Sequence, residues 1–98
     1  MSELVGKKVI VRGFGSGVEY GTLEDQNGQE VTLRNARRLW RWSGANSLSQ
    51  LAVDGTARPS ECNFTVALDS ITLLDIVEIL PCTDKAIASI ESVPVWKI

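Results

Sequence analysis

The dipeptide Asn27-Gly28, flanked by alternating residues, is the feature that most constrains the fold of this chain. Asn-Gly is the strongest short-range signal of a β-hairpin, because both residues tolerate the positive φ angles of a tight turn. We therefore expect a hairpin over residues 18–33. A two-residue loop would oppose like charges and misalign the apolar positions, so we favour a three-residue loop over residues 26–28. In that register Gly28 is left-handed and Leu23 pairs with Val31.

Short runs of β-branched and aromatic residues predict the remaining strands. Residues 34–37 read as a turn. Residues 71–80 also fit a helix, but their β-branched content and the stop at Pro81 favour a strand. The strands expected outside the hairpin cover residues 8–12, 38–42, 63–68 and 71–80.

Two short helices are predicted from their first residues. Ser47 and Gln50 match a capping box, which indicates a helix that ends at about Val53. Thr83 or Asp84 can cap a second helix over residues 84–92. The apolar tail, residues 93–98, either adds an edge strand or packs against another subunit. Because the core is small and this tail is apolar, we expect a homo-oligomer.

Ninety-eight residues suffice for one domain with a small core. The fold class that we expect is α+β, with a small, mostly antiparallel β-sheet, one or two short helices, and a single domain over residues 1–98. Residues 54–62 form a polar segment that we expect to be a flexible loop.

The composition argues against an enzyme. There is no histidine, so the commonest general base and metal ligand is missing. Cys62 and Cys82 match no zinc or redox spacing, and we expect them to be free, half-buried thiols. We expect no catalytic residue, no metal and no cofactor. No stretch approaches the roughly 20 apolar residues of a membrane span, and residues 1–6 lack the pattern of a signal peptide. A cytoplasmic protein with no membrane contact is the expectation.

The net charge of −2 conceals a basic segment. Between Glu30 and Asp54 there are four arginines and no carboxylate, so this window carries +4 and the rest of the chain −6. Arginine binds phosphate in a bidentate manner, and tryptophan offers a face on which a base can stack. The window therefore indicates a site for an anionic, nucleotide-like ligand.

Arg37, Arg38, Trp40 and Trp42 are the main candidates for this site. Strand periodicity would place Arg38, Trp40 and Trp42 on one face, opposite Leu39 and Arg41. Asn35 and Ser43 could add hydrogen bonds. Equally, two tryptophans on a strand can simply fill a small core, with arginine stems packed over them. The full set of candidate ligand-binding residues is Phe14, Ser16, Tyr20, Asn35, Arg37, Arg38, Trp40, Arg41 and Trp42.

Residues 13–17, Gly-Phe-Gly-Ser-Gly, are called the glycine loop below. They lack the spacing of a dinucleotide fingerprint, and a strand rather than a helix is expected after them. Their main interpretation is a flexible connection between two strands. The alternative is a nest of backbone amides that approaches a phosphate.

The chain also resembles a family of small phage- and prophage-encoded domains without an assigned function. The resemblance implies a viral accessory gene, which would act in the cytoplasm of the host, and carries over no catalytic residue. Such proteins recurrently counter host defence, so a nucleotide immune signal is one candidate ligand. The alternatives are an inhibitor that contacts a host defence protein directly, or a minor phage structural or assembly component. The segments that carry the resemblance are residues 9–12, 17–23, 35–40, 44–45, 47–52 and 79–83, with Trp96.

Overall fold

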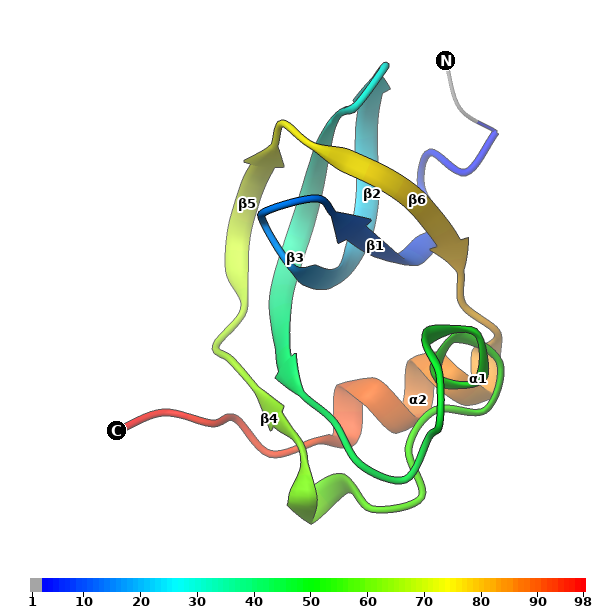
Figure 1. The fold of residues 1–98 in the computed structure, drawn as a ribbon, viewed down its shortest axis with the longest axis vertical. Coiled ribbons are helices and arrows are strands. Elements are labelled where there is room, and N and C mark those ends of the chain that lie inside the picture. Colours follow the sequence, from blue (N-terminus) through cyan, green and yellow to red (C-terminus); the bar gives the residue numbers. More distant parts are fainter. Residues whose placement is uncertain (1–2) are drawn as a thin grey trace.

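Within residues 3–98 the chain forms six strands, two α-helices and one short 3₁₀ helix (Figure 1). The computed structural model describes residues 3–98; residues 1 and 2, which begin the segment inspected above for a signal peptide, lie outside the described residues. The elements are β1 (Lys8–Gly13), β2 (Val18–Asn27), β3 (Glu30–Arg41), α1 (Leu48–Asp54), the 3₁₀ helix η1 (Pro59–Glu61), β4 (Asn63–Phe64), β5 (Leu68–Leu73), β6 (Ile76–Pro81) and α2 (Asp84–Ser92).

The sheet curls on itself. Strands β1, β2 and β3 form an antiparallel meander, β6 pairs with the free edge of β1, and β4 and β5 pair with the free edge of β3. Only Leu74 and Asp75 separate β5 from β6, although these strands lie at opposite edges of the sheet. Two residues cannot cross a flat sheet of this width, so the edges must approach each other as in a partly open barrel (Figure 1).

The hairpin of β2 and β3 is confirmed, but its predicted register is wrong. Asn27 pairs with Glu30, so the loop consists of Gly28 and Gln29, and Leu23 pairs with Leu33. The register shifts between Leu23 and Asp25. This bulge lets the apolar residues Leu23 and Leu33 pair although the loop has only two residues. The left-handed conformation predicted for Gly28 is confirmed by its φ of +61°.

The predicted turn over residues 34–37 is wrong, because β3 continues through it. The turn-like composition marks a bulge instead: the register with β2 shifts between Tyr20 and Thr22. Asn35 has a φ of +50°, a conformation that asparagine tolerates better than most residues. Gly21 faces this bulge, where a Cβ atom would lie 2.9 Å from the carbonyl oxygen of Arg34. All four arginines of the basic window therefore lie on this one long strand.

The strand expected over residues 71–80 is present, but as parts of β5 and β6 separated by the turn at Leu74 and Asp75. The strand predicted over residues 63–68 is interrupted, because only β4 and the first residue of β5 are extended there. An alternating apolar pattern does not show where a strand leaves one partner for another.

Both helices begin where predicted. The Ser47 hydroxyl accepts from the amide of Gln50 and starts α1, and the Thr83 hydroxyl accepts from the amide of Ala86 and starts α2. The helices pack together at the end of the sheet opposite the β2–β3 turn (Figure 1). Beyond α2 the tail lies along β4, with a parallel bridge between Phe64 and Val95. The tail therefore lies beside the sheet at β4, but it forms this isolated bridge rather than the edge strand that was one of the two expectations.

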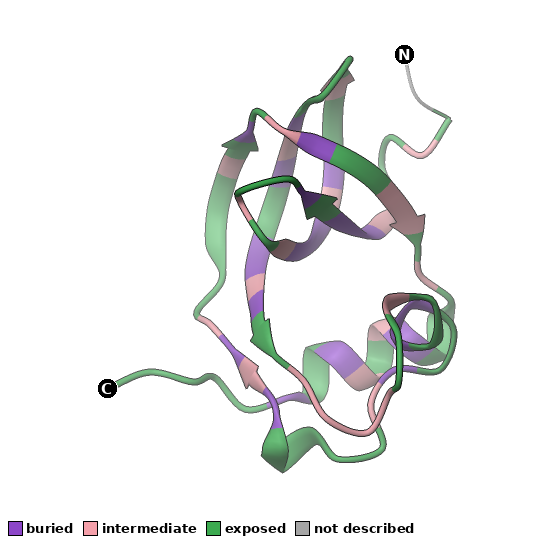
Figure 2. Ribbon diagram, viewed as in Figure 1, coloured by how far each residue is buried: buried purple, intermediate pink, exposed green. Residues whose placement is uncertain are grey.

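Strand β1 separates two apolar clusters. Val9 and Val11 face a cluster inside the curled sheet, and Ile10 faces a second cluster shared with the helices. All three side chains are fully buried, since each face of the strand is covered (Figure 2). Leu39, Phe64 and several helix residues complete the second cluster. This cluster supports the end of β3 on which the candidate site lies.

Candidate functional site

A cleft of about 280 Å³ opens between the glycine loop and the end of β3. The structure thus brings together four of the predicted residues, Ser16, Arg38, Trp40 and Trp42, from two separate segments. Phe14 belongs to the same loop but is 91% exposed. The residues that line the cleft are Gly15, Ser16, Gly17, Val18, Arg38, Leu39, Trp40 and Trp42.

The glycine loop is held by Asp75, from the turn between β5 and β6. The Asp75 carboxylate accepts hydrogen bonds from the amides of Gly15 and Ser16 and from the Ser16 hydroxyl. The hydroxyl of Ser16 and the amide of Gly15 hold the pKa of the Asp75 carboxyl below its usual value. The loop therefore does form an amide nest, but its own chain supplies the anion.

Arg38 lies between the glycine loop and a buried carboxylate. Its Nη1 donates to the carbonyl oxygen of Ser16 at 2.7 Å, and its Nη2 lies 2.9 Å from Oε2 of Glu19. The Glu19 side chain is only 1% exposed, whereas that of Arg38 is 39% exposed. A guanidinium has five N–H donors, so Arg38 retains donors for a ligand.

Glu19 is the residue of this site that sequence reasoning missed. Burial raises the pKa of its carboxyl, and the positive charge of Arg38 opposes that rise without cancelling it. Its Oε2 receives no hydrogen bond of good geometry from any residue within 3–98, despite the short distance to Arg38. The only available signal was an acidic residue in a strand opposite the basic window, which did not reveal its burial.

Trp40, in β3, and Trp42, just beyond its end, have different surroundings. Trp42 packs against the same apolar cluster as Leu39, whereas Trp40 is 66% exposed. Trp42 nevertheless lines the cleft with Arg38 and Trp40, as the sequence predicted, and Leu39 lines it as well. The register of β3 against β4 shifts between Leu39 and Arg41. Arg41 is exposed at the end of the strand.

Arg37 lies apart from the cleft and is 7% exposed. Its guanidinium lies over the ring of Phe64, 5.5 Å from the centroid. Burial lowers the pKa of this guanidinium from its usual value. The fold uses its donors, which reach the carbonyl oxygens of Phe64, Thr65, Ile90 and Pro94.

Tyr20 and Asn35 line a second hollow, of about 320 Å³, together with Arg37. The Tyr20 hydroxyl donates to Glu91, which also accepts from Lys8. These two donors lower the pKa of the Glu91 carboxyl, while burial and the bond to Glu91 raise the pKa of Tyr20. Lys8 and Glu91 of this hollow are thus paired with each other, and Arg37 donates to backbone carbonyl oxygens.

A third hollow, about 490 Å³, lies beside the β2–β3 turn and β6, away from the cleft. Its one charged lining residue, Glu78, is paired with Arg12. It holds no cation or aromatic side chain among its lining residues, so we place the candidate site at the smaller cleft.

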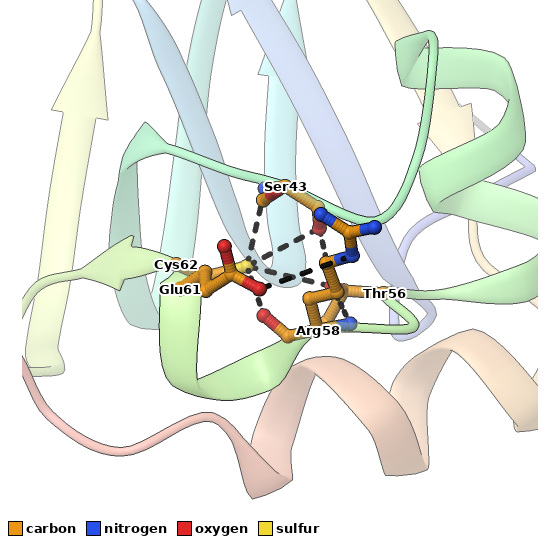
Figure 3. A network of polar contacts seen from close by, with 5 residues as sticks. All are labelled: Ser43, Thr56, Arg58, Glu61 and Cys62. Atoms are coloured by element: carbon orange, nitrogen blue, oxygen red, sulfur yellow. Dashed lines mark hydrogen bonds and ion pairs between the residues drawn. The ribbon is translucent and has the colours of Figure 1, made fainter.

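Cys62 anchors the segment that follows β3 (Figure 3). Its Sγ receives the amide of Ser43 at 3.5 Å and lies 3.6 Å from the carbonyl oxygen of Arg58. The Thr56 hydroxyl donates to the carbonyl oxygen of Ser43. Ser43 therefore makes its hydrogen bonds within this network. Residues 54–62 contact the same network through Thr56 and Arg58, and their flexibility stays a prediction. Both cysteines are free, Cys62 buried and Cys82 half-buried.

These observations define the class of this protein. It is a small α+β domain with one six-stranded antiparallel sheet, two short helices and a cleft at the end of β3. The chain belongs to the family described as a domain of unknown function, DUF6948, whose model matches residues 6–90. Membership of a family without an assigned function, which the sequence predicted, is thereby confirmed. No curated protein and no solved structure matches the chain. Within residues 3–98, no helix is both long enough and apolar enough to cross a membrane.

Proposed function

We propose that this chain is a non-enzymatic binding domain that holds an anionic, nucleotide-like ligand in the cleft. The observation that carries the proposal is the meeting of Arg38, Trp40 and Trp42 with the glycine loop around one hollow. A guanidinium beside exposed indole surface suits a phosphate joined to a base. Among the residues described, the one hydroxyl that lines the cleft is that of Ser16, and it donates to the Asp75 carboxylate that holds the glycine loop.

The charge distribution supports Arg38 as the residue that would bind the ligand's phosphate. The amides of the glycine loop are occupied by the Asp75 carboxylate, which would repel a second anion. Arg38 is partly exposed and is held in place on two sides, by Glu19 and by the Ser16 carbonyl. A preoriented donor of this kind loses less entropy on binding. The base would then stack on Trp40.

The biological setting that we propose is a phage-encoded accessory protein that sequesters a nucleotide immune signal in the host cytoplasm. Its support is the resemblance described above together with the chemistry of the cleft. We also propose that the protein forms a homo-oligomer, and a monomer mass in light scattering would overturn that part alone.

A thermal-shift screen tests the proposal with cyclic di- and trinucleotides and ADP-ribose derivatives. A ligand at 100 times its dissociation constant stabilises the fold by about 2.7 kcal/mol, or roughly 10 °C or more for a domain of this size. Trp40→Ala, at an exposed position, should abolish the shift while the protein stays folded. The double variant Glu19→Gln, Arg38→Gln should do the same without leaving an unpaired buried charge.

Arg34→Gln is the matched control, because Arg34 lies on the same strand but pairs with Glu24 away from the cleft. The control should bind as the wild type does. The absence of any shift at several hundred micromolar of every probe would contradict the proposal, since micromolar affinity would be detected there.

A second candidate function is direct inhibition of a host defence protein. It is favoured by the exposure of Phe14 at the tip of the glycine loop and of Trp40. Exposed aromatic residues beside arginine are typical hot spots of protein interfaces. Under this candidate, a purified defence protein should bind with a measurable heat, and Phe14→Ala should weaken binding. Nucleotides should leave that affinity unchanged; competition by them would favour the first candidate.

A further inference from the structure

A second aromatic surface lies directly beside the cleft. The indole of Trp40 stacks on that of Trp96, with ring centroids 6.4 Å apart and an interplanar angle of 14°. Trp40 extends from β3 and Trp96 from the tail, on the two sides of β4. Both remain accessible, with exposed fractions of 66% and 48%. The pair therefore presents indole surface to solvent in addition to the part of Trp40 that lines the cleft.

The main chain fixes this arrangement. The amide of Trp96 donates to the carbonyl oxygen of Phe64 at 2.8 Å, and the adjacent Val95 bridges the same residue. One step earlier, the carbonyl of Pro94 accepts from the buried Arg37. The main-chain position of Trp96 is thus set by contacts that do not involve its side chain, and the indole, although stacked on Trp40, keeps about half of its surface exposed.

Two exposed cations follow the stacked tryptophans in the chain. Arg41 follows Trp40 in the chain and Lys97 follows Trp96, and both are exposed. Within residues 3–98 the exposed cations without an ion-pair partner are Lys7, Arg41 and Lys97. The other cations are either paired with a carboxylate, as are Lys8, Arg12, Arg34, Arg38, Arg58 and Lys85, or buried, as is Arg37.

We infer that the ligand of the cleft is a dinucleotide, with one base in the cleft and the second on the Trp40–Trp96 pair. This inference rests on the proposed function and specifies its ligand class. Trp40 belongs to both surfaces, so two bases of one ligand can occupy them together. Arg38 and Arg41 are three residues apart on β3, about 10 Å of extended strand, so each could contact a different phosphate of one ligand. A mononucleotide would leave Trp96, Arg41 and Lys97 unused.

The test compares adenosine monophosphate, linear pApA, cyclic di-adenosine monophosphate and a longer oligoadenylate by tryptophan fluorescence. One or both dinucleotides should bind at least about five-fold more tightly than the mononucleotide, since a stacked base contributes about 1–3 kcal/mol. Which of them binds more tightly distinguishes a linear from a cyclic ligand. Trp96→Ala and Lys97→Gln should remove this advantage and leave the affinity for the mononucleotide unchanged, and Trp96→Phe should restore part of it.

Val53→Ala and Lys7→Gln are matched controls, because both residues are exposed and line neither aromatic surface. Equal affinity for one base and two would overturn the inference and leave the proposed function intact. The same holds if Trp96→Ala weakens the mononucleotide equally, which would make Trp96 a structural support. Tighter binding of the longer strand would replace the dinucleotide with single-stranded nucleic acid. If no nucleotide binds the wild type, the proposed function itself fails.

Discussion

Arg37→Met provides the sharpest test of how the basic window is divided between fold and site. Arg37 donates to the carbonyl oxygens of Phe64, Thr65, Ile90 and Pro94. It thereby joins β3 to β4, to the last turn of α2 and to the tail. A cation near the C-terminus of a helix also interacts favourably with the helix dipole. Methionine preserves much of the volume but none of the donors.

The expected loss of stability follows from these contacts. Each hydrogen bond from a charged donor contributes about 1.5–3 kcal/mol, but the desolvation of a buried guanidinium offsets much of the sum. In the variant the carbonyl oxygens of Phe64 and Ile90 would still accept hydrogen bonds from the amides of Trp96 and Val93, respectively, so neither would be left unsatisfied. We expect a net loss of about 3 kcal/mol, out of roughly 5–15 for a domain. At about 4–8 °C per kcal/mol, the Tm should fall by about 12–24 °C.

Thermal unfolding followed by circular dichroism measures this change. Arg41→Met is the matched control, since Arg41 lies on the same strand and is exposed, and its Tm should change by less than about 4 °C. Hydrogen exchange should show faster exchange at the amide of Trp96 in the Arg37 variant alone, because the tail loses its anchor at Pro94. Similar Tm values for the two variants would refute the structural role assigned to Arg37.

Three further predictions concern buried or capping groups. Glu19→Gln should gain stability relative to the wild type as the pH rises from about 4 to 8. The reason is that the folded-state pKa of Glu19 is raised, so its ionisation opposes folding. A Tm difference between the two proteins that is constant with pH would contradict this. Ser47→Ala removes the cap of α1 and should lower stability by about 1 kcal/mol in denaturant titration, whereas an unchanged midpoint would show that Asn46 and Gln50 hold the turn alone. Burial raises the pKa of Cys82 to about 11, so a disulfide reagent at neutral pH should label this thiol only after unfolding, as peptide mapping can establish.

The local parts of the fold were predictable. Helix caps and the hairpin turn depend on residues within a few positions of one another, so Ser47, Thr83 and Gly28 identify their elements correctly. The register of β2 against β3 was not, because two bulges shift it and each is stabilised by contacts across the sheet. The division of residues 63–80 among three strands likewise depends on which edge each segment reaches.

The candidate site was predictable in composition but not in arrangement. Arg38, Trp40 and Trp42 could be identified because their chemistry is evident from residue type and strand spacing. That Glu19 is the buried partner of Arg38 depends on the pairing of Glu19 with Arg38 across β2 and β3. The role of Trp96 depends on the path of the tail beside β4. Neither relation can be predicted from a pattern of neighbouring residues, because each joins segments that are far apart in the sequence.

The structure also changes what the charge of the basic window implies. Of its four arginines, Arg34 forms an ion pair with Glu24 and Arg38 forms one with Glu19. Arg37 donates its hydrogen bonds to backbone carbonyl oxygens. Only Arg41 is free, and Lys97 joins it from outside the window. A single-stranded nucleic acid that contacted Arg38, Arg41 and Lys97 would therefore show a log–log salt slope of about −2, at roughly −0.7 per phosphate contact. Such a shallow slope leaves most of the affinity to stacking, which favours a short ligand with bases over a long polyanion.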